Sequence, residues 1–185
     1  NQISMHTPSR TSSASPLGIV AGGGTFPLLV AENARKTGRK VYSVGFKGHT
    51  DQPMDKASDG FRMLRLGQLG RMIRFFKANQ VTDLCFAGAI NKPKALDIRP
   101  DWRVVRIMMR LNTKGDNALF KALFEELERE GFRMIQAASQ VPSLYARSGV
   151  YTPQAVPDKV WADLAYGWRV AKEIGRLDIG QTVVV

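Results

Sequence analysis

The chain has 185 residues, of which 44% are hydrophobic and 23% charged, a composition typical of a globular protein and not of a disordered one. The formal net charge of +11 favours anionic partners, namely nucleic acid, an anionic membrane surface or a phosphorylated substrate, without choosing among them. One cysteine excludes a disulfide within the chain, two histidines leave almost no material for a histidine-based metal site, and no apolar run is long enough to span a bilayer.

The first predicted strand runs directly into a glycine-rich turn. Residues 1–16 are rich in Ser, Thr and Pro and are predicted to form a flexible tail, after which an apolar strand is expected over 17–20. Gly22, Gly23, Gly24 and Thr25 follow, and a helix is predicted from residue 26 to 37. A strand, a glycine turn and a helix N-terminus together favour phosphate binding, because the first helical N–H groups are unpaired. The alternative is a tight turn of an α/β fold.

The glycine spacing argues against a dinucleotide cofactor. That fingerprint requires three glycines as G-x-G-x-x-G, and Pro27 stands where the third would be. An acidic residue is also expected near the end of the second strand, to hold a ribose hydroxyl. The second predicted strand, 41–46, ends in Gly45-Phe46-Lys47 without an acid. Both departures count against an NAD-dependent enzyme.

Strands and helices are predicted to alternate along the rest of the first 137 residues. The later strands are expected over 63–66, 83–87 and 132–137, and the later helices over 71–79, 101–111 and 117–130. The pattern predicts an α/β fold, a Rossmann-like parallel sheet with helices on both faces. Glycine turns at Gly67 and Gly88 would then join Gly22 at the carboxyl edge of the sheet, where such folds bind ligands.

The sequence changes character after Ala137. Proline and glycine punctuate an irregular segment, a helix is predicted over 158–174, and the chain closes on a β-branched run at residues 182–185. We interpret residues 17–137 as one domain and 138–185 as the start of an incomplete C-terminal domain. The alternative for the β-branched run is an edge strand that pairs back onto the sheet.

Arginines recur at residues 99, 103, 106 and 110, which forms one stripe on an otherwise apolar predicted helix. Such a helix is buried, lies at an interface or lies on a membrane. One interpretation is recognition of an anionic lipid surface or a phosphate; the other is a packing helix whose arginines pair with acids elsewhere.

Asp97, Asp101 and Asp116 are predicted to cap helices rather than to hold a metal ion. Cys85, within an apolar run, is predicted to be a core residue.

Five stretches taken together resemble a known family. They are residues 18–28, 66–70, 81–88, 97–102 and 178–185, and in this order and spacing they resemble the UDP-2,3-diacylglucosamine pyrophosphatases of the I type, from lipid A biosynthesis in Gram-negative bacteria. The resemblance covers residues 17–185. It implies hydrolysis of UDP-2,3-diacylglucosamine to UMP and 2,3-diacylglucosamine 1-phosphate, with a divalent metal such as Mg²⁺ whose ligands are not identified.

The resemblance also sets expectations for the site and the partners. It places the catalytic aspartate in the C-terminal domain beyond Val185, so no catalytic residue is expected within this chain and the chain is expected to be inactive alone. The expected substrate contacts are Gly22, Gly23, Gly24, Thr25, Gly67, Gln68, Gly88, Ala89, Gln181 and Thr182. We expect a cytoplasmic protein that contacts the anionic inner membrane peripherally, forms a homodimer and binds no nucleic acid. The alternative is a non-catalytic module that binds a nucleotide or phospholipid.

Overall fold

A computed structural model of the chain describes residues 15–90, 99–110, 116–177, 179–180 and 182–185, without side chains at 116–118. The strands are β1 (Leu17–Ala21), β2 (Val41–Phe46), β3 (Gly60–Leu64), β4 (Asp83–Ala87) and β5 (Arg133–Met134). The helices are α1 (Phe26–Lys36), α2 (Met54–Ala57), α3 (Leu69–Ala78), α4 (Trp102–Arg110), α5 (Asp116–Arg129) and α6 (Asp158–Arg176), with 3₁₀ turns η2 (Ala137–Gln140) and η3 (Pro142–Leu144). Contacts divide the chain into two compact units, Asn1–Tyr145 and Ala146–Val185, and each is described by itself.

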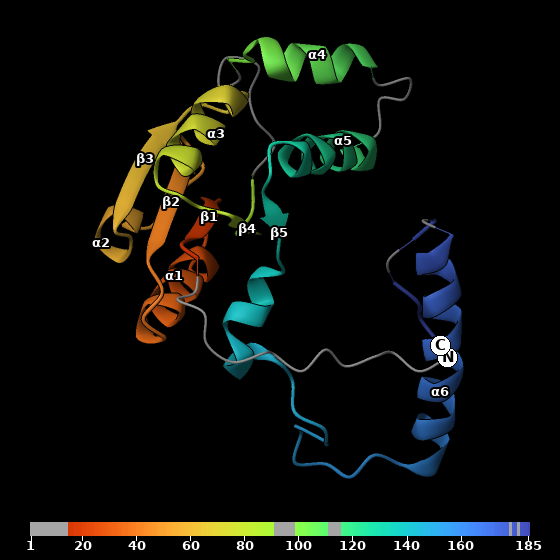
Figure 1. Ribbon diagram of the computed structural model, residues 1–185. Coiled ribbons are helices and arrows are strands. Elements are labelled where there is room, and N and C mark those ends of the chain that lie inside the picture. The colour runs from red at the N-terminus through yellow and green to blue at the C-terminus, as the bar shows by residue number, and fades with distance from the viewer. Residues whose placement is uncertain (1–14, 91–98, 111–115, 178, 181) are drawn as a thin grey trace. The chain divides into compact units, whose positions relative to one another are not determined.

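The first unit is built on a parallel sheet with the strand order β3-β2-β1-β4-β5 (Figure 1). Leu17 of β1 lies opposite Val41 of β2 on one side and Asp83 of β4 on the other. The chain therefore builds outward from β1 in one direction and then crosses to its other side, so the topological switch point lies between β1 and β4. The predicted Rossmann-like α/β fold is confirmed.

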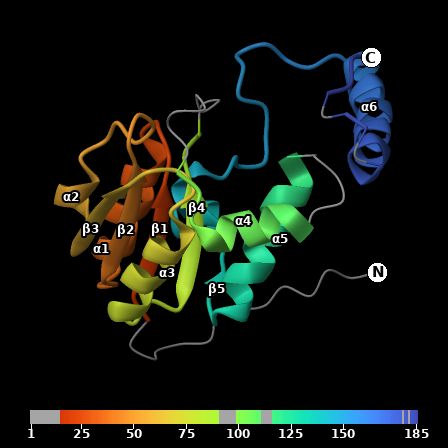
Figure 2. The same cartoon turned by 90° about the horizontal axis from the view of Figure 1, so that it is seen from above.

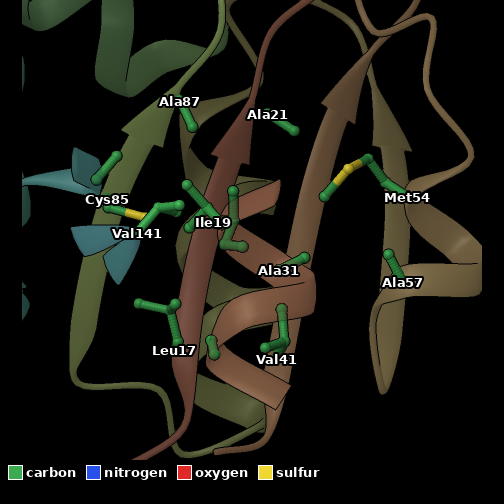
Figure 3. Close-up of a cluster of buried hydrophobic side chains, with 13 residues drawn as sticks. Leu17, Ile19, Ala21, Ala31, Val41, Met54, Ala57, Cys85, Ala87 and Val141 are labelled. Carbon is green, nitrogen blue, oxygen red and sulfur yellow. The ribbon is translucent and has the colours of Figure 1, made fainter. Parts of the chain in front are cut away.

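Alternation along the strands gives the sheet two apolar faces. Leu17, Ile19 and Ala21 of β1 pack into a cluster with residues of α1, α2 and η2, and Figure 3 shows this cluster around the strand. Val20 and Val44 belong to the opposite cluster, which α3, α4 and α5 cover. Helices α4 and α5 contact each other at the β4–β5 end of the sheet (Figure 2). Such burial on both faces explains the near-continuous apolar runs of the central strands.

Cys85 lies in the first of these clusters and is fully buried. Burial raises the pKa of its thiol to about 12, so the reactive thiolate is not formed at neutral pH. The prediction that Cys85 is a core residue is confirmed.

A buried carboxylate at the start of β4 ties three distant segments together. Arg133 donates two hydrogen bonds to Asp83, at 2.8 and 2.9 Å, and Arg39 pairs with the same carboxylate. Arg39 also donates to the carbonyl oxygen of Ser15 at 2.6 Å and to Oε1 of Gln140 at 3.4 Å. The Asp83 side chain is only 6% exposed, so this cluster closes the amino end of the sheet.

The structure departs from the sequence predictions at the edges of the sheet. Strand β3 occupies Gly60–Leu64 and not 63–66, β5 is two residues long and not six, and α2 was not predicted. The shift of β3 arises from its pairing, because Gly60 lies opposite Tyr42 and an added Cβ there would be 2.8 Å from the Tyr42 ring. Met63 is 39% exposed at this edge. The apolar residues over 63–66, on which the prediction rested, therefore mark only the last two residues of the strand.

The second unit contains α6 and the segments around it. The β-branched run predicted as a strand lies in no strand among the residues described there, and the Val185 side chain instead packs on Gly167 of α6. Residues 138–145, which we assigned to the second domain, fall in the first unit, and Val141 packs into its core. In the described part of the chain, no helix combines the length and apolar character needed to cross a bilayer.

Candidate functional site

The turn from β1 into α1 lies at the topological switch point, and its glycine N–H groups already have partners. Gly22 donates to the carbonyl oxygen of Ala87 and Gly23 to that of Ala89, both at 2.8 Å. Ala89 donates back to the Gly23 carbonyl oxygen at 3.2 Å, which forms an isolated antiparallel bridge. These glycines therefore do not present their N–H groups to a ligand; they join the turns that follow β1 and β4.

The close approach of these two turns explains why glycine occupies two of the predicted positions. A Cβ on Gly22 would lie 2.5 Å from the carbonyl oxygen of Ala89. Gly88 has a φ of +85°, and a Cβ there would lie 2.5 Å from the carbonyl oxygen of Gly23. Both conflicts are with backbone, which cannot swing aside as a side chain does. Packing between the turns thus requires these glycines whether or not a ligand is bound.

The first turn of α1 offers the anion-binding groups that the glycines do not. The chain enters α1 through Thr25, and Pro27 lies in the first turn as predicted. Among the described residues, the N–H groups of Thr25, Phe26 and Leu28 have no hydrogen-bond partner, and no acidic side chain lies in the first turn. Unpaired N–H groups and the positive end of the helix dipole favour an anion here. We call these three N–H groups the α1 anion site.

The second glycine turn is filled by the protein's own chain. A Cβ on Gly67 would lie 2.8 Å from Cα of Pro100, and Gln68 accepts a hydrogen bond from the Arg65 N–H at 3.0 Å. At the start of α3, the Gly70 N–H donates to Asp101 at 2.6 Å. These contacts satisfy the turn internally. Contact of Gly67 and Gln68 with substrate stays a prediction.

The Asp101 carboxylate caps two helices at once. Its Oδ1 accepts hydrogen bonds from the N–H groups of Arg103 and Val104 in α4, at 3.1 and 3.2 Å. Its Oδ2 accepts the hydrogen bond from the Gly70 N–H in α3. The predicted capping role of Asp101 is therefore confirmed. The side chain of Asp116 and all of Asp97 lie outside the described residues.

A loop that follows β2 reaches the β1–α1 turn, and the sequence reasoning missed it. Thr50 donates its hydroxyl to the carbonyl oxygen of Ala21 at 2.6 Å, and Oδ1 of Asp51 accepts from the Gly24 N–H at 3.0 Å. His49 is 8% exposed, and both of its ring nitrogens are buried without a hydrogen-bond partner within the described structure. Strand β2 ends without an acid, as the sequence shows, but Asp51 reaches the glycine turn from five residues beyond the end of the strand. The polar loop between β2 and α2 was the available signal.

The remaining predicted site residues are less informative. Ala89 lies at the bridge to Gly23. Thr182 is exposed in the second unit, and Gln181 lies outside the described residues. Their contact with substrate stays a prediction.

One arginine of the stripe has the packing role, and two others are exposed. Arg103 forms ion pairs with Glu126 and Glu130 of the α5 segment, so it packs α4 against its neighbour. Arg106 and Arg110 are exposed on the same helix. Trp102, Met108 and Met109 are also exposed, at 65%, 56% and 66%. The outer face of α4 therefore combines apolar and cationic side chains.

The described residues hold no group of three or more His, Cys, Asp or Glu side chains that could bind a metal ion. Asp51 is a carboxylate at the β1–α1 turn, and Mg²⁺ is commonly held by one or two carboxylates together with substrate phosphates. The divalent metal that the resemblance implies stays a prediction.

Comparisons with known proteins agree with this architecture. Residues 16–144 match the model of the LpxI N-terminal domain, and residues 147–185 match that of the LpxI C-terminal domain. The chain is 30% identical over 172 residues to the UDP-2,3-diacylglucosamine pyrophosphatase LpxI of Caulobacter vibrioides, a match that covers 91% of this chain and 61% of that protein. The chain thus spans about three-fifths of the length of this relative. The two domain models match in order along nearly the whole chain, and the chain belongs to the LpxI family.

Proposed function

We propose that this chain binds UDP-2,3-diacylglucosamine through its diphosphate at the α1 anion site. In the reaction of the pyrophosphohydrolase, this substrate yields UMP and 2,3-diacylglucosamine 1-phosphate. The observation that carries the proposal is that the N–H groups of Thr25, Phe26 and Leu28, at the switch point between β1 and β4, have no partner among the residues that the structure describes. Family membership and the activity for which the Caulobacter relative is named support the choice of substrate.

The proposal assigns substrate binding to the chain and no catalytic residue. Mg²⁺ remains part of the proposed reaction, and the phosphates of the substrate would supply part of its coordination. We propose that this chain binds the substrate, and a chimera tests whether it also supports UMP release.

Isothermal titration calorimetry with UDP and uridine tests the binding proposal. We expect UDP to bind at least about tenfold more tightly than uridine, because only UDP carries the anion for the helix N-terminus. Added salt weakens this preference by screening charge. Equal affinities for UDP and uridine would contradict a diphosphate site.

A chimera separates the hydrolase from the non-catalytic binding module. In it, the aligned residues of this chain replace the 172 matching residues of the Caulobacter protein. The hydrolase proposal expects UMP release from UDP-2,3-diacylglucosamine in the presence of Mg²⁺. A folded chimera that binds UDP without releasing UMP would favour the binding module.

We further propose that the outer face of α4 contacts an anionic membrane surface. Trp102, Arg106 and Met109 recur at helical spacing, so they lie on one face, and apolar and cationic side chains together are typical of helices at a lipid interface. Such contact suits a diacylated substrate. The same face is available to a second copy of the chain, and the homodimer stays a prediction.

Flotation with phosphatidylglycerol vesicles tests the membrane contact. Trp102→Ser with Arg106→Glu is expected to reduce the bound fraction severalfold, since both the apolar and the charge attraction are lost. Trp168→Ser is the matched control, because Trp168 is 67% exposed but lies on α6. Equal vesicle binding by both variants would refute membrane contact through the outer face of α4. A dimer that covers α4 would instead appear in sedimentation velocity as a dimeric species that the Trp102→Ser substitution dissociates.

A further inference from the structure

The loop between β2 and α2 is fixed to the end of β1 by a pair of threonine contacts. The Thr50 hydroxyl accepts a hydrogen bond from the Phe46 N–H at 2.8 Å and donates to the carbonyl oxygen of Ala21 at 2.6 Å. The next residue, Asp51, then accepts from the Gly24 N–H through Oδ1. The carboxylate is therefore held at a defined position beside the β1–α1 turn, yet the residue is exposed and open to a ligand.

A second observation in the same loop indicates that its polar groups are not all satisfied internally. His49 is more than nine-tenths buried with both ring nitrogens unpaired in the described structure. Its carbonyl oxygen lies 2.7 Å from where a Cβ on Gly23 would be, so the loop packs directly on the glycine turn. Buried polar groups without a partner are rare in folded proteins and call for a specific explanation.

We propose that Asp51 recognises the ribose of the bound nucleotide. Oδ1 keeps its hydrogen bond from Gly24, and Oδ2 accepts hydrogen bonds from the ribose hydroxyls. An ionised carboxylate accepts through both oxygens, so the two tasks are compatible. In parallel α/β sheets, an acid near the end of the second strand commonly has this role. The inference rests on the proposed nucleotide binding and adds the residue that selects a ribonucleotide.

Charge divides the site between the carboxylate and the diphosphate. The Asp51 carboxylate already takes the Gly24 N–H, so the diphosphate is left with the N–H groups of Thr25, Phe26 and Leu28. Asp51 and the diphosphate are both negative and repel each other, which places the ribose next to the acid. The competing explanation is that Asp51 is an internal anion that the diphosphate displaces from Gly24. The two explanations predict different effects of removing the carboxylate.

Calorimetry with three ligands and the Asp51→Ala variant distinguishes these explanations. The ligands are UDP, 2′,3′-dideoxyuridine diphosphate and inorganic pyrophosphate. We expect the wild-type chain to prefer UDP to the dideoxy compound by about tenfold, the effect of hydrogen bonds to a charged group. Asp51→Ala is expected to abolish this preference, because only the ribose hydroxyls lose a partner, whereas pyrophosphate binding is expected to tighten as the repulsion is lost. Asp55→Ala, which removes an exposed acid from the neighbouring α2, is the control and is expected to keep the preference.

Each other outcome overturns the assignment in a recognisable way. A preference for UDP that survives in Asp51→Ala refutes ribose recognition by this residue. Tighter binding of both UDP and pyrophosphate to Asp51→Ala, with the preference for UDP over the dideoxy compound unchanged, shows that Asp51 is only the displaced anion. If the wild-type chain binds pyrophosphate but binds UDP no more tightly than the dideoxy compound, the ribose inference alone is refuted. If it binds neither UDP nor pyrophosphate, the proposed function is refuted as well. Urea unfolding of each variant shows whether a loss of binding is due to misfolding. If Asp51→Ala does not fold, the same titrations are made with Asp51→Asn, which retains an oxygen to accept the Gly24 hydrogen bond.

Discussion

Replacing Gly88 by alanine is expected to lower the free energy of unfolding by about 3 kcal/mol and to abolish UDP binding. Gly88 has a φ of +85°, which side chains with a Cβ rarely adopt, and the new Cβ would lie 2.5 Å from the backbone oxygen of Gly23. Either the backbone of the turn moves or the bridge between Gly23 and Ala89 breaks. Urea unfolding and UDP titration of the same preparation measure both effects.

Gly24→Ala is the matched control for the Gly88 substitution. Gly24 has nearly the same φ, +83°, but no atom lies within 4 Å of where its Cβ would be. The control therefore has the conformational cost without the collision, and we expect a loss of about 1 kcal/mol. Equal losses at the two positions would show that the turns after β1 and β4 are not packed as described.

Asp83→Asn is expected to destabilise the chain by about 3 kcal/mol at pH 7, because it leaves the nearly buried Arg39 without a full counter-charge. The amide also cannot accept both hydrogen bonds that Arg133 donates. Glu125→Gln is the control, since Glu125 pairs with Arg129 at the surface, where such pairs contribute less than about 1 kcal/mol. Similar losses in the two variants would show that the Asp83 cluster contributes no more than a surface pair.

The effect of Asp83→Asn is also expected to depend on pH. Burial raises the pKa of Asp83, but the hydrogen bonds from Arg133 and Arg39, together with their charges, outweigh burial and hold the pKa below its ordinary value. The unfolded chain therefore takes up the proton first, and the stabilisation is complete above about pH 4 and is lost as the pH falls through the folded-state pKa. The difference in unfolding free energy between wild type and Asp83→Asn is expected to stay constant from pH 7 to about pH 5 and to narrow as the pH falls below about 4. A difference that stays constant below about pH 4 would contradict an ionised, hydrogen-bonded Asp83.

The central sheet could be predicted from the sequence because its strands are buried on both faces. Continuous apolar runs such as residues 17–20 identify such strands without information from distant residues. The edge strand β3 was misplaced because two of its positions, Arg62 and Met63, are exposed, so the strand is not a continuous apolar run. Its limits are set by its pairing with β2. Capping by Asp101 was predictable in kind from its position before a helix. Its second partner, Gly70, was not, because that contact depends on tertiary packing.

The candidate site could be located but not detailed from the sequence. The glycines correctly marked the turn, yet the N–H groups of Gly22 and Gly23 pair with the end of β4 and the turn after it, more than sixty residues away in the sequence. The Gly24 N–H pairs with Asp51. The groups left for an anion belong to Thr25 and the first turn of α1. Asp51 was missed because a polar loop gives no sign of where its side chains will lie once the chain has folded. Long-range pairing, and not local propensity, decides which backbone groups remain free.

The most direct test of nucleotide binding at the α1 anion site is an NMR titration of the ¹⁵N-labelled chain with UDP. We expect the largest amide shifts at Thr25, Phe26 and Leu28, whose N–H groups have no partner in the described structure. Gly70, at the start of α3, should shift little, because Asp101 already occupies its N–H. Saturable shifts confined to the first turn of α1 and its neighbouring loops would support the proposed site. Shifts centred on Gly70, or none at saturating UDP, would contradict it.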